Sequence, residues 1–418
     1  MELIYRTGPL ANANQEGKMV NVGVDLHKTQ FTICARRLGE GEFFSKYSTE
    51  EGGYKEFIKL ITKWQECGEE VRVGVESTGN TRYFKNRMEE IGVVVKVINP
   101  LKMKVVNESV KKTDKHDAAT IAEFLEKDML PLSQLCSRES EQLRRLLKVR
   151  TMLVKTVTVI KNQIHALLLS EGLPDVKSSA LQSKKGRKET LNALNQCING
   201  LVAHPLFEMI DRLEENVNSI EKQLRTLVKG DRTVELLMTI PGCGEICAWT
   251  IRAYTDDIKR FANPKKYCSF AGLAPWVQNS NETVRHGKIT KRGPKELRTA
   301  LVQVVMGLRR MKAKTFTWHM IKRYDILKQS KGSGKAIIAT ARKIAVIIWM
   351  MLTREEMFKL ERMTDPKLVK KSAEMRKTMG GKTESYQSEI QDKPKNVGTS
   401  RKTVKKSGVA RNKKKKVG

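Results

Sequence analysis

Apolar and polar positions in the first third of the chain alternate between a period of two and a helical period. Residues 19–37 read MVNVGVDLHKTQFTICARR and predict two strands with a polar break at Asp25–Thr29. Further strands are predicted by EFFSKYST, VRVGVE and VVVKVIN, the last ended by Asn99-Pro100. Apolar residues at helical spacing predict helices over 52–67, 81–91 and 114–125. The predicted order is βββαβαβα.

This order predicts an α/β domain over residues 19–135. In the ribonuclease H-like fold, three antiparallel strands come first, and parallel strands joined by helices follow. We therefore expect an N-terminal ribonuclease H-like domain. Residues 1–18 are interpreted as a loose leader.

The pattern changes to long helices after residue 136. Glu141–Leu169 and Leu191–Lys229 contain few helix breakers, and SSALQSKKGRKE separates them. They predict an antiparallel hairpin or coiled coil over 136–230, suited to a spacer or a dimerisation element. A mainly helical domain is expected over 231–358, ending in a helix at Ala336–Leu352, with Cys268 and Trp276 in its core. Residues 359–418 are predicted to be a basic, disordered tail.

The charge balance indicates a polyanionic partner. The chain carries 79 Lys plus Arg against 46 Asp plus Glu, a formal net charge of +33. Residues 366–418 contribute +13 of this, from 17 basic and 4 acidic residues, so the remaining chain still carries +20. Nucleic acid is the commonest partner of such a protein. Charge alone leaves open a ribosome-associated or chaperone-like basic protein.

Secretion and membrane insertion are not indicated by the sequence. The longest late apolar run, Ile344–Leu352, has nine residues, whereas a spanning helix needs about 20. The seven cysteines are odd in number and scattered, which predicts reduced thiols in a cytoplasmic protein. With nucleic acid as its partner, we expect the protein to be nucleoid-associated. Cys243 and Cys247 lack the second pair that a structural zinc site requires.

Four carboxylates form a candidate metal site. Asp25 and Glu76 directly follow the buried runs VNVGV and VRVGV, and Asp114 and Asp117 share one face at a helix start. If the two strands are neighbours, their side chains leave the sheet at the same end. Oxygen ligands of this kind suit Mg²⁺ or Mn²⁺, and paired ions can clamp a phosphodiester during strand cleavage. Taken singly, each acid also fits a loop or a helix cap.

A basic stretch in the third region is a candidate nucleic-acid site. It reads NSNETVRHGKITKRGPKELR, and its glycines predict a loop that passes close to phosphate. The candidate phosphate-binding residues are Arg285, His286, Lys288, Lys291, Arg292, Lys295 and Arg298. Ser280 in this stretch fits either a cap or a nucleophile activated by neighbouring cations.

The segment IPGCGE is similar to the hairpin of a helix-hairpin-helix element. Gly242 and Gly244 would permit a tight turn and a close approach of backbone N–H groups to a DNA phosphate. A Pro-Gly turn before a helix is the alternative.

Taken together and in order, these motifs resemble one family. GVDLHK, GVESTG, KTDKHDAATIAEFL, IPGCGE, FAGLAP and SNETVRHGKITKRGPKELR are similar to segments of the transposases of the insertion-sequence 110 family, which includes the Piv-type DNA invertases. The resemblance covers about residues 20–350. The family usually has Ser-Gly at its serine, whereas Asn281 follows Ser280 here; asparagine also tolerates left-handed backbone. Ser269, in KKYCSFAGL, is the alternative serine.

The resemblance implies an architecture and a chemistry. It implies a RuvC-like domain whose Asp-Glu-Asp-Asp metal site corresponds to Asp25, Glu76, Asp114 and Asp117, then a coiled-coil linker and a transposase domain with Ser280 as nucleophile. It further implies a homo-oligomer, dimer or tetramer, in which the serine of one subunit meets the acids of another. Donor DNA, target DNA and a structured bridge RNA are the implied partners.

Three functions remain open at this point. The first is an RNA-guided transposase or recombinase, with a Piv-type invertase that uses no guide RNA as a subclass. The second is a RuvC-like junction nuclease that uses metal-activated water, with Ser280 only structural. The third is a nucleic-acid binder without activity.

Overall fold

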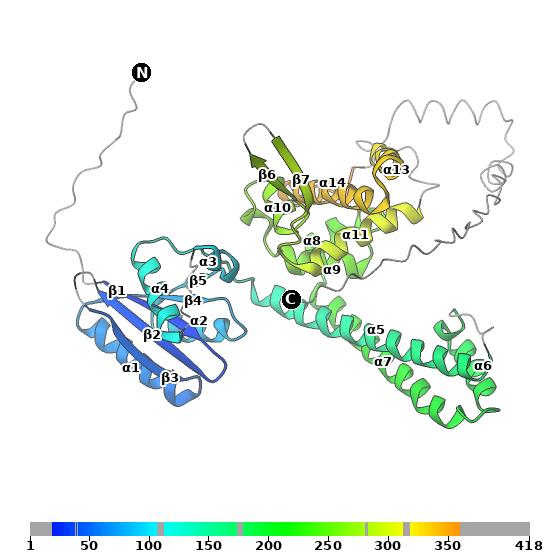
Figure 1. Ribbon diagram of the computed structural model, residues 1–418, viewed down its shortest axis with the longest axis horizontal. Coiled ribbons are helices and arrows are strands. Elements are labelled where there is room, and N and C mark those ends of the chain that lie inside the picture. The colour runs from blue at the N-terminus through cyan, green and yellow to red at the C-terminus, as the bar shows by residue number, and fades with distance from the viewer. Residues whose placement is uncertain are drawn as a thin grey trace, which may run out of the picture. The chain divides into compact units, whose positions relative to one another are not determined.

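The computed structural model describes residues 19–359 apart from 38, 40, 107–112, 174–178, 281–282 and 312–317. The predicted leader and tail therefore lie outside the described residues. The chain divides between Gln142 and Leu143 into two compact units, here called the N-terminal and C-terminal units (Figure 1).

The N-terminal unit is built on a five-stranded mixed sheet in the order β3-β2-β1-β4-β5. The strands are β1 Met19–Leu26, β2 Gln30–Arg37, β3 Phe43–Ser48, β4 Glu70–Glu76 and β5 Val94–Ile98. β1, β2 and β3 pair antiparallel, whereas β4 pairs in parallel with β1 and with β5. The predicted strands and their mixed pairing are confirmed.

Helices cover both faces of this sheet (Figure 1). On one face, α1 Glu51–Glu66 and α2 Thr81–Glu89 pack aromatic and aliphatic side chains, such as Phe57 and Phe84, against the valines of β1 and β4. Helix α4, Asp114–Glu126, lies on the other face. It approaches closely because a Cβ at Gly23 in β1 would lie only 2.1 Å from the carbonyl oxygen of Ala118.

One helix of this unit was not predicted. Asn99-Pro100 ends β5, as expected, but it also begins α3, Pro100–Val106. The Asn99 side chain accepts hydrogen bonds from the backbone N–H groups of Leu101 and Lys102, and proline is favoured at the first helical position.

The C-terminal unit contains most of one long helix, which begins just before the unit boundary, and all of a second, antiparallel one. Helix α5, Arg138–Ser170, and helix α7, Gly200–Leu227, lie side by side (Figure 1). Their ion pairs run in opposite senses: Arg150 Nε lies 2.8 Å from Glu221, and Lys161 Nζ lies 3.2 Å from Glu214. The expected helical hairpin is therefore present in this unit.

The prediction of one continuous helix over Leu191–Lys229 was wrong. A separate helix, α6 Lys184–Leu194, precedes α7, and residues 195–199 between them are not helical. Ser183 caps α6, and the buried guanidinium of Arg187 bonds to Asp211 and Glu214 of α7. These bonds hold α6 across α7, a tertiary effect that helical periodicity does not encode.

The remainder of the C-terminal unit is mainly helical, as predicted. Its elements are α8 Arg232–Met238, α9 Glu245–Thr255, the short turn η2 Ile258–Arg260, α10 Pro264–Phe270, β6 Pro275–Ser280, β7 Thr283–Ile289, α11 Lys295–Arg310, α13 His319–Lys331 and α14 Ser333–Arg354. By length and composition α14 could cross a membrane, although its apolar run looked too short. Its inward face, including Ile344 and Ile348, is buried in the core of the unit.

Two expectations for this region were wrong. The basic stretch after residue 278 is not a loop throughout, because β6 and β7 pair there as an antiparallel hairpin. Trp276 in β6 is 52% exposed rather than part of the core, whereas Cys268 is buried.

Candidate metal centre and nucleic-acid interface

The register of the sheet places a row of polar side chains across one face. Asp25 in β1 pairs with Thr32 in β2, and Thr32 pairs with Lys46 in β3. On the other side of β1, Val24 pairs with Val75, so Glu76 ends β4 beside Asp25. Directly opposed residues on neighbouring strands share a face.

This row lies on the face that α4 covers. Gly23 and Gly74, two residues before Asp25 and Glu76, both face α4. Because side chains in a strand alternate with a period of two, Asp25 and Glu76 point to the same side as these glycines. The expectation that the two carboxylates leave neighbouring strands at one end is therefore confirmed, although Asp25 lies within β1 rather than after it.

The other two carboxylates lie in the first turn of α4. Thr113 caps this helix, and its hydroxyl oxygen accepts a hydrogen bond from the His116 N–H at 3.2 Å. Asp114 and Asp117 follow the cap, where the positive end of the helix dipole favours negative charge.

Short distances join the strand end to the helix start. His27 Nε2 lies 3.1 Å from Asp25 Oδ2 and 3.6 Å from Asp114 Oδ1. One ligand atom from each of these three residues lies within 4.8 Å of the others. Lys46 Nζ lies 3.8 Å from Asp114 Oδ2. The fold thus brings together residues that are 89 positions apart in the sequence.

The ionised form of the Asp25 side chain is disfavoured in this cluster when no cation is bound. The side chain is 17% exposed. Burial raises the pKa of Asp25; the nearby His27 lowers it, while Asp117 and Asp114 raise it further. A cation at the cluster would relieve this cost, and carboxylate oxygens are the ligands that Mg²⁺ and Mn²⁺ prefer. The donor set therefore fits a hard divalent ion.

Three neighbours of the cluster were not assigned from the sequence. His27 could have been suspected from the sequence, because it follows Asp25 by two positions. Lys46 and Thr32 become visible only through the register of β2 and β3. The buried Thr32 hydroxyl has no hydrogen-bond partner among the residues that the structure describes.

The predicted serine and the basic residues lie on or after the β6/β7 hairpin. Ser280 ends β6 and pairs with Thr283, and the backbone of Arg285 and His286 lies in β7. The side chains of these three candidates lie outside the described part. Lys288, Lys291, Arg292 and Lys295 are exposed.

Arg298 has a structural contact that the sequence did not indicate. Its guanidinium donates hydrogen bonds to the carbonyl oxygens of Ala271 and Lys291, each at 3.2 Å. It therefore ties the cationic loop before α11 to the end of α10. Its contact with nucleic acid stays a prediction.

The two glycines of IPGCGE differ in their surroundings. Gly242 has a φ of +80°, and a Cβ there would lie 2.6 Å from the backbone nitrogen of Leu308. The packing of this turn against α11 is enough to require glycine. Gly244 is exposed and is the N-cap residue that precedes α9. A phosphate contact by either glycine remains a prediction.

The thiols of Cys243 and Cys247 are partly or fully shielded from water. Burial raises the pKa of Cys243 to about 12 and also raises that of Cys247, which favours the protonated thiol at both positions.

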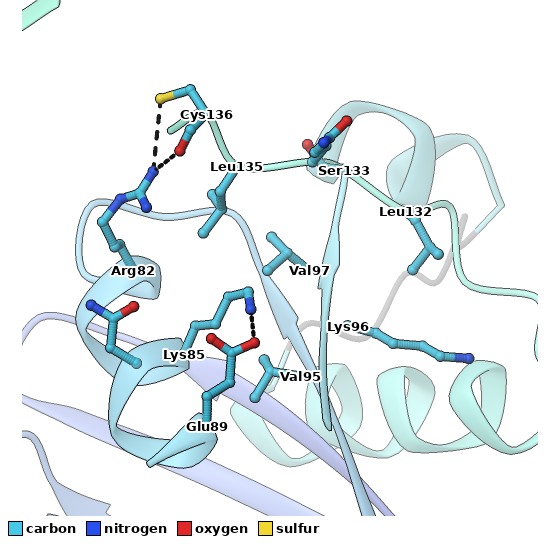
Figure 2. A pocket seen from close by; sticks show the side chains of 12 residues that line it. Arg82, Lys85, Glu89, Val95, Lys96, Val97, Leu132, Ser133, Leu135 and Cys136 are labelled. Atoms are coloured by element: carbon cyan, nitrogen blue, oxygen red, sulfur yellow. Dashed lines mark hydrogen bonds and ion pairs between the residues drawn. The ribbon is translucent and has the colours of Figure 1, made fainter. Parts of the chain in front are cut away.

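A cavity of about 550 Å³ lies beside β5 in the N-terminal unit (Figure 2). Its lining includes Val95, Val97 and Leu135 but none of the four carboxylates. Arg82 donates to the Cys136 carbonyl oxygen, and Lys85 pairs with Glu89 across the cavity wall (Figure 2). Because these charges are already paired, we do not take this cavity as the candidate functional site.

Two models of known protein families match this chain. A family model described as a DEDD transposase of the IS110 type matches residues 22–171. A second model, described as "Transposase IS116/IS110/IS902 family", matches residues 234–319. The two matches contain the carboxylate cluster and the β6/β7 hairpin, respectively.

Individual relatives match over most of their length. A transposase for insertion sequence element IS1111A from Coxiella burnetii is 28% identical over 81% of this chain and 91% of its own length. A probable family 20 transposase from Pseudomonas aeruginosa is 26% identical over 81% and 94%. A pilin gene-inverting protein from Moraxella bovis is 23% identical over 81% and 97%. The chain therefore belongs to the IS110/IS116/IS902 family of insertion-sequence transposases.

Proposed function

We propose that this transposase cuts and rejoins DNA strands with a divalent cation held by its N-terminal carboxylates and with Ser280 as the nucleophile. The observation that carries the proposal is the convergence of Asp25, His27 and Asp114 within 4.8 Å at the start of α4. The strand order β3-β2-β1-β4-β5, with α4 over the face that carries the row of polar side chains, supports a RuvC-like variant of the ribonuclease H fold over 19–135. The α5/α7 hairpin would be a coiled-coil linker over 136–230, followed by the transposase domain over 231–358.

The four carboxylates divide the task of holding the cation. Asp25 and Glu76 come from rigid neighbouring strands, and Asp114 and Asp117 come from one turn of α4. When bound, Mg²⁺ or Mn²⁺ would neutralise phosphate charge and polarise the phosphorus centre. Lys46 is suited to contact a non-bridging phosphate oxygen, since its ammonium lies at the rim of the cluster and is half exposed.

Ser280 would supply the covalent step. Its Oγ bonds to phosphorus while the bond from phosphorus to one DNA oxygen breaks. The serine proton passes to solvent, and the departing oxygen takes up a proton. A hydroxyl of a second strand then attacks the same phosphorus while the bond from phosphorus to Ser280 Oγ breaks. The hydroxyl gives up its proton to solvent, the serine oxygen takes one up, and the strands are joined. Because one phosphodiester replaces another, no nucleotide cofactor is consumed.

The proposed partners are nucleic acids and further copies of this chain. The net charge of +20 outside the tail supports binding of donor DNA, target DNA and a structured bridge RNA by a dimer or tetramer. The matching pilin gene-inverting protein favours a second candidate, in which the chain inverts DNA without a guide RNA. A metal-dependent junction nuclease is the third candidate.

RNA that survives a high-salt wash of the purified protein is the first test of guidance. A single abundant structured RNA encoded beside the gene supports guided transposition and supplies the donor and target sites. Heterogeneous RNA that salt removes favours the guide-free invertase or the nuclease.

The nucleophile is tested with labelled DNA that contains these sites. Wild type should form a protein–DNA adduct that survives denaturing detergent, and Ser280→Ala should lose both the adduct and strand exchange. Ser269→Ala tests the alternative serine, which is exposed on α10, and should keep both the adduct and strand exchange. Unchanged cleavage by both variants would instead assign the chemistry to water and the chain to the nuclease class.

A further inference from the structure

Trp276 is an aromatic side chain that the fold leaves exposed. Of the five tryptophans, Trp64, Trp249 and Trp318 are at most 9% exposed. Trp349 is partly buried and donates its Nε1–H to the carbonyl oxygen of Phe261 at 3.0 Å. Trp276 is 52% exposed. Trp276 is therefore the tryptophan of the five that the fold leaves most open to solvent.

The hairpin holds this ring in place. Pro275 pairs with Ile289 and Val277 pairs with His286, so Trp276 stands opposite two residues of β7, Gly287 and Lys288. This is a β-bulge, a feature that re-aims a side chain. A Cβ at Gly287 would lie 2.7 Å from Trp276 Cε3. The ring therefore packs over a bare glycine backbone, which supports one part of the ring and leaves the rest to solvent.

Exposed basic residues lie opposite this ring in the hairpin and directly after the hairpin in the sequence. Lys288 in the bulge is exposed, and Lys291, Arg292 and Lys295 are exposed just after the hairpin. Protein interfaces are depleted of lysine at their centres. An exposed aromatic within a cationic surface is instead typical of sites for unpaired nucleic acid, where bases stack and lysines bind the backbone.

We propose that Trp276 is a stacking platform for an unpaired nucleobase, with Lys288 binding an adjacent phosphate. The ligand class is a single-stranded or flipped-out nucleotide of DNA or RNA, because every base offers a π face. The proposal does not depend on the carboxylate cluster or on Ser280.

The test measures binding of a labelled dT oligonucleotide and of a blunt DNA duplex by fluorescence anisotropy over a range of salt. Trp276→Ala should weaken oligonucleotide binding roughly 5- to 150-fold. The slope of log affinity against log salt should stay unchanged, because no charge is removed. Lys288→Ala should instead reduce that slope by about 0.7. Duplex binding by Trp276→Ala should remain at the wild-type level.

Two variants separate stacking from loss of structure. Trp276→Phe keeps an aromatic face and should retain most of the affinity. Tyr83→Ala removes another half-exposed aromatic, on α2, and should leave binding unchanged. In wild type the oligonucleotide should also protect the exposed tryptophan from acrylamide quenching.

Several outcomes would overturn the proposal. Unchanged oligonucleotide affinity in Trp276→Ala would do so, as would an equal loss of duplex binding, which would make the ring a structural support. Protection from acrylamide that depends on protein concentration without nucleic acid would assign the surface to a second copy. An rU oligonucleotide of the same length shows whether the ligand is DNA or RNA. If Trp276→Ala weakens binding of both oligonucleotides equally, the site accepts either nucleic acid; if it weakens only one, that one is the ligand.

Discussion

Replacing Gly23 by alanine tests whether the spacing between β1 and α4 sets the geometry of the carboxylates. The new Cβ would lie 2.1 Å from the Ala118 carbonyl oxygen and 2.4 Å from the Ala122 nitrogen. Both atoms belong to the backbone of α4, so no side-chain rotation relieves the clash. Moving from 2.1 Å to the 3.4 Å where ordinary contact begins requires a retreat of about 1.3 Å.

Such a retreat has consequences for stability and for chemistry. Overpacking of a close contact costs about 1–3 kcal/mol, and we expect the upper end because the atoms are backbone. Asp114 and Asp117 move with α4, away from Asp25. A misplacement of about 1 Å can cost about 100-fold in rate, so DNA cleavage should fall by that order although no carboxylate is altered.

Two further glycines provide a graded series. At Gly74 the nearest atom would be a side-chain carbon of Ile121 at 2.9 Å, which can move, so Gly74→Ala should have a smaller effect. Gly52 in α1 has nothing within 4 Å, and Gly52→Ala should be neutral or stabilising by up to about 1 kcal/mol.

The assays are cleavage of labelled DNA and hydrogen exchange of peptides from β1 and α4. Gly23→Ala should speed exchange in these peptides by up to about 100-fold. Wild-type exchange and wild-type cleavage in Gly23→Ala would refute the reasoning, and so would equal effects of all three substitutions.

The remaining predictions concern charge. Lys46→Met should tighten Mn²⁺ binding about two- to five-fold, because it removes a cation 3.8 Å from Asp114, while DNA cleavage falls; metal titration and cleavage rates check both. The pKa of Asp25 is raised above its ordinary 3.8, so the folded state binds the proton more tightly than the unfolded state. The free energy of unfolding, measured in EDTA, should therefore fall as pH rises from 3.8 through the raised pKa. Asp25→Asn should lose that slope in urea unfolding at several pH values; an identical slope would exclude the burial argument. Arg187→Met should lower the free energy of unfolding by about 2 kcal/mol, since it leaves two carboxylates facing each other beside a buried position; an unchanged melting temperature would contradict this.

The sheet, and the positions of the four acids at a strand end or a helix start, could be predicted from the sequence because their signals are local. Alternating valines mark β1 and β4, and each acid comes at a strand end or a helix start. Lys46 could not be found in this way, because its place beside Asp114 depends on the register of two intervening pairings.

The hairpin and α6 escaped prediction for other reasons. The strands β6 and β7 are short and polar, so no apolar alternation marks them, and Trp276 resembled a core residue by its type alone. The break before α7 depends on Arg187 bonding across to Asp211 and Glu214, which lie 24 and 27 positions later. Such contacts outweigh local propensity and leave no periodic signal.

Mn²⁺ binding measured by electron paramagnetic resonance tests the central claim most directly, because it requires neither a target site nor a guide. Wild type should show a saturable site, and Asp25→Asn and Asp114→Asn should each weaken it at least about ten-fold. Asp128→Asn is the control, since Asp128 is 79% exposed and paired with Lys96, and it should bind as wild type does. Equal Mn²⁺ binding by all four proteins would contradict the assignment of the carboxylate cluster as the metal centre.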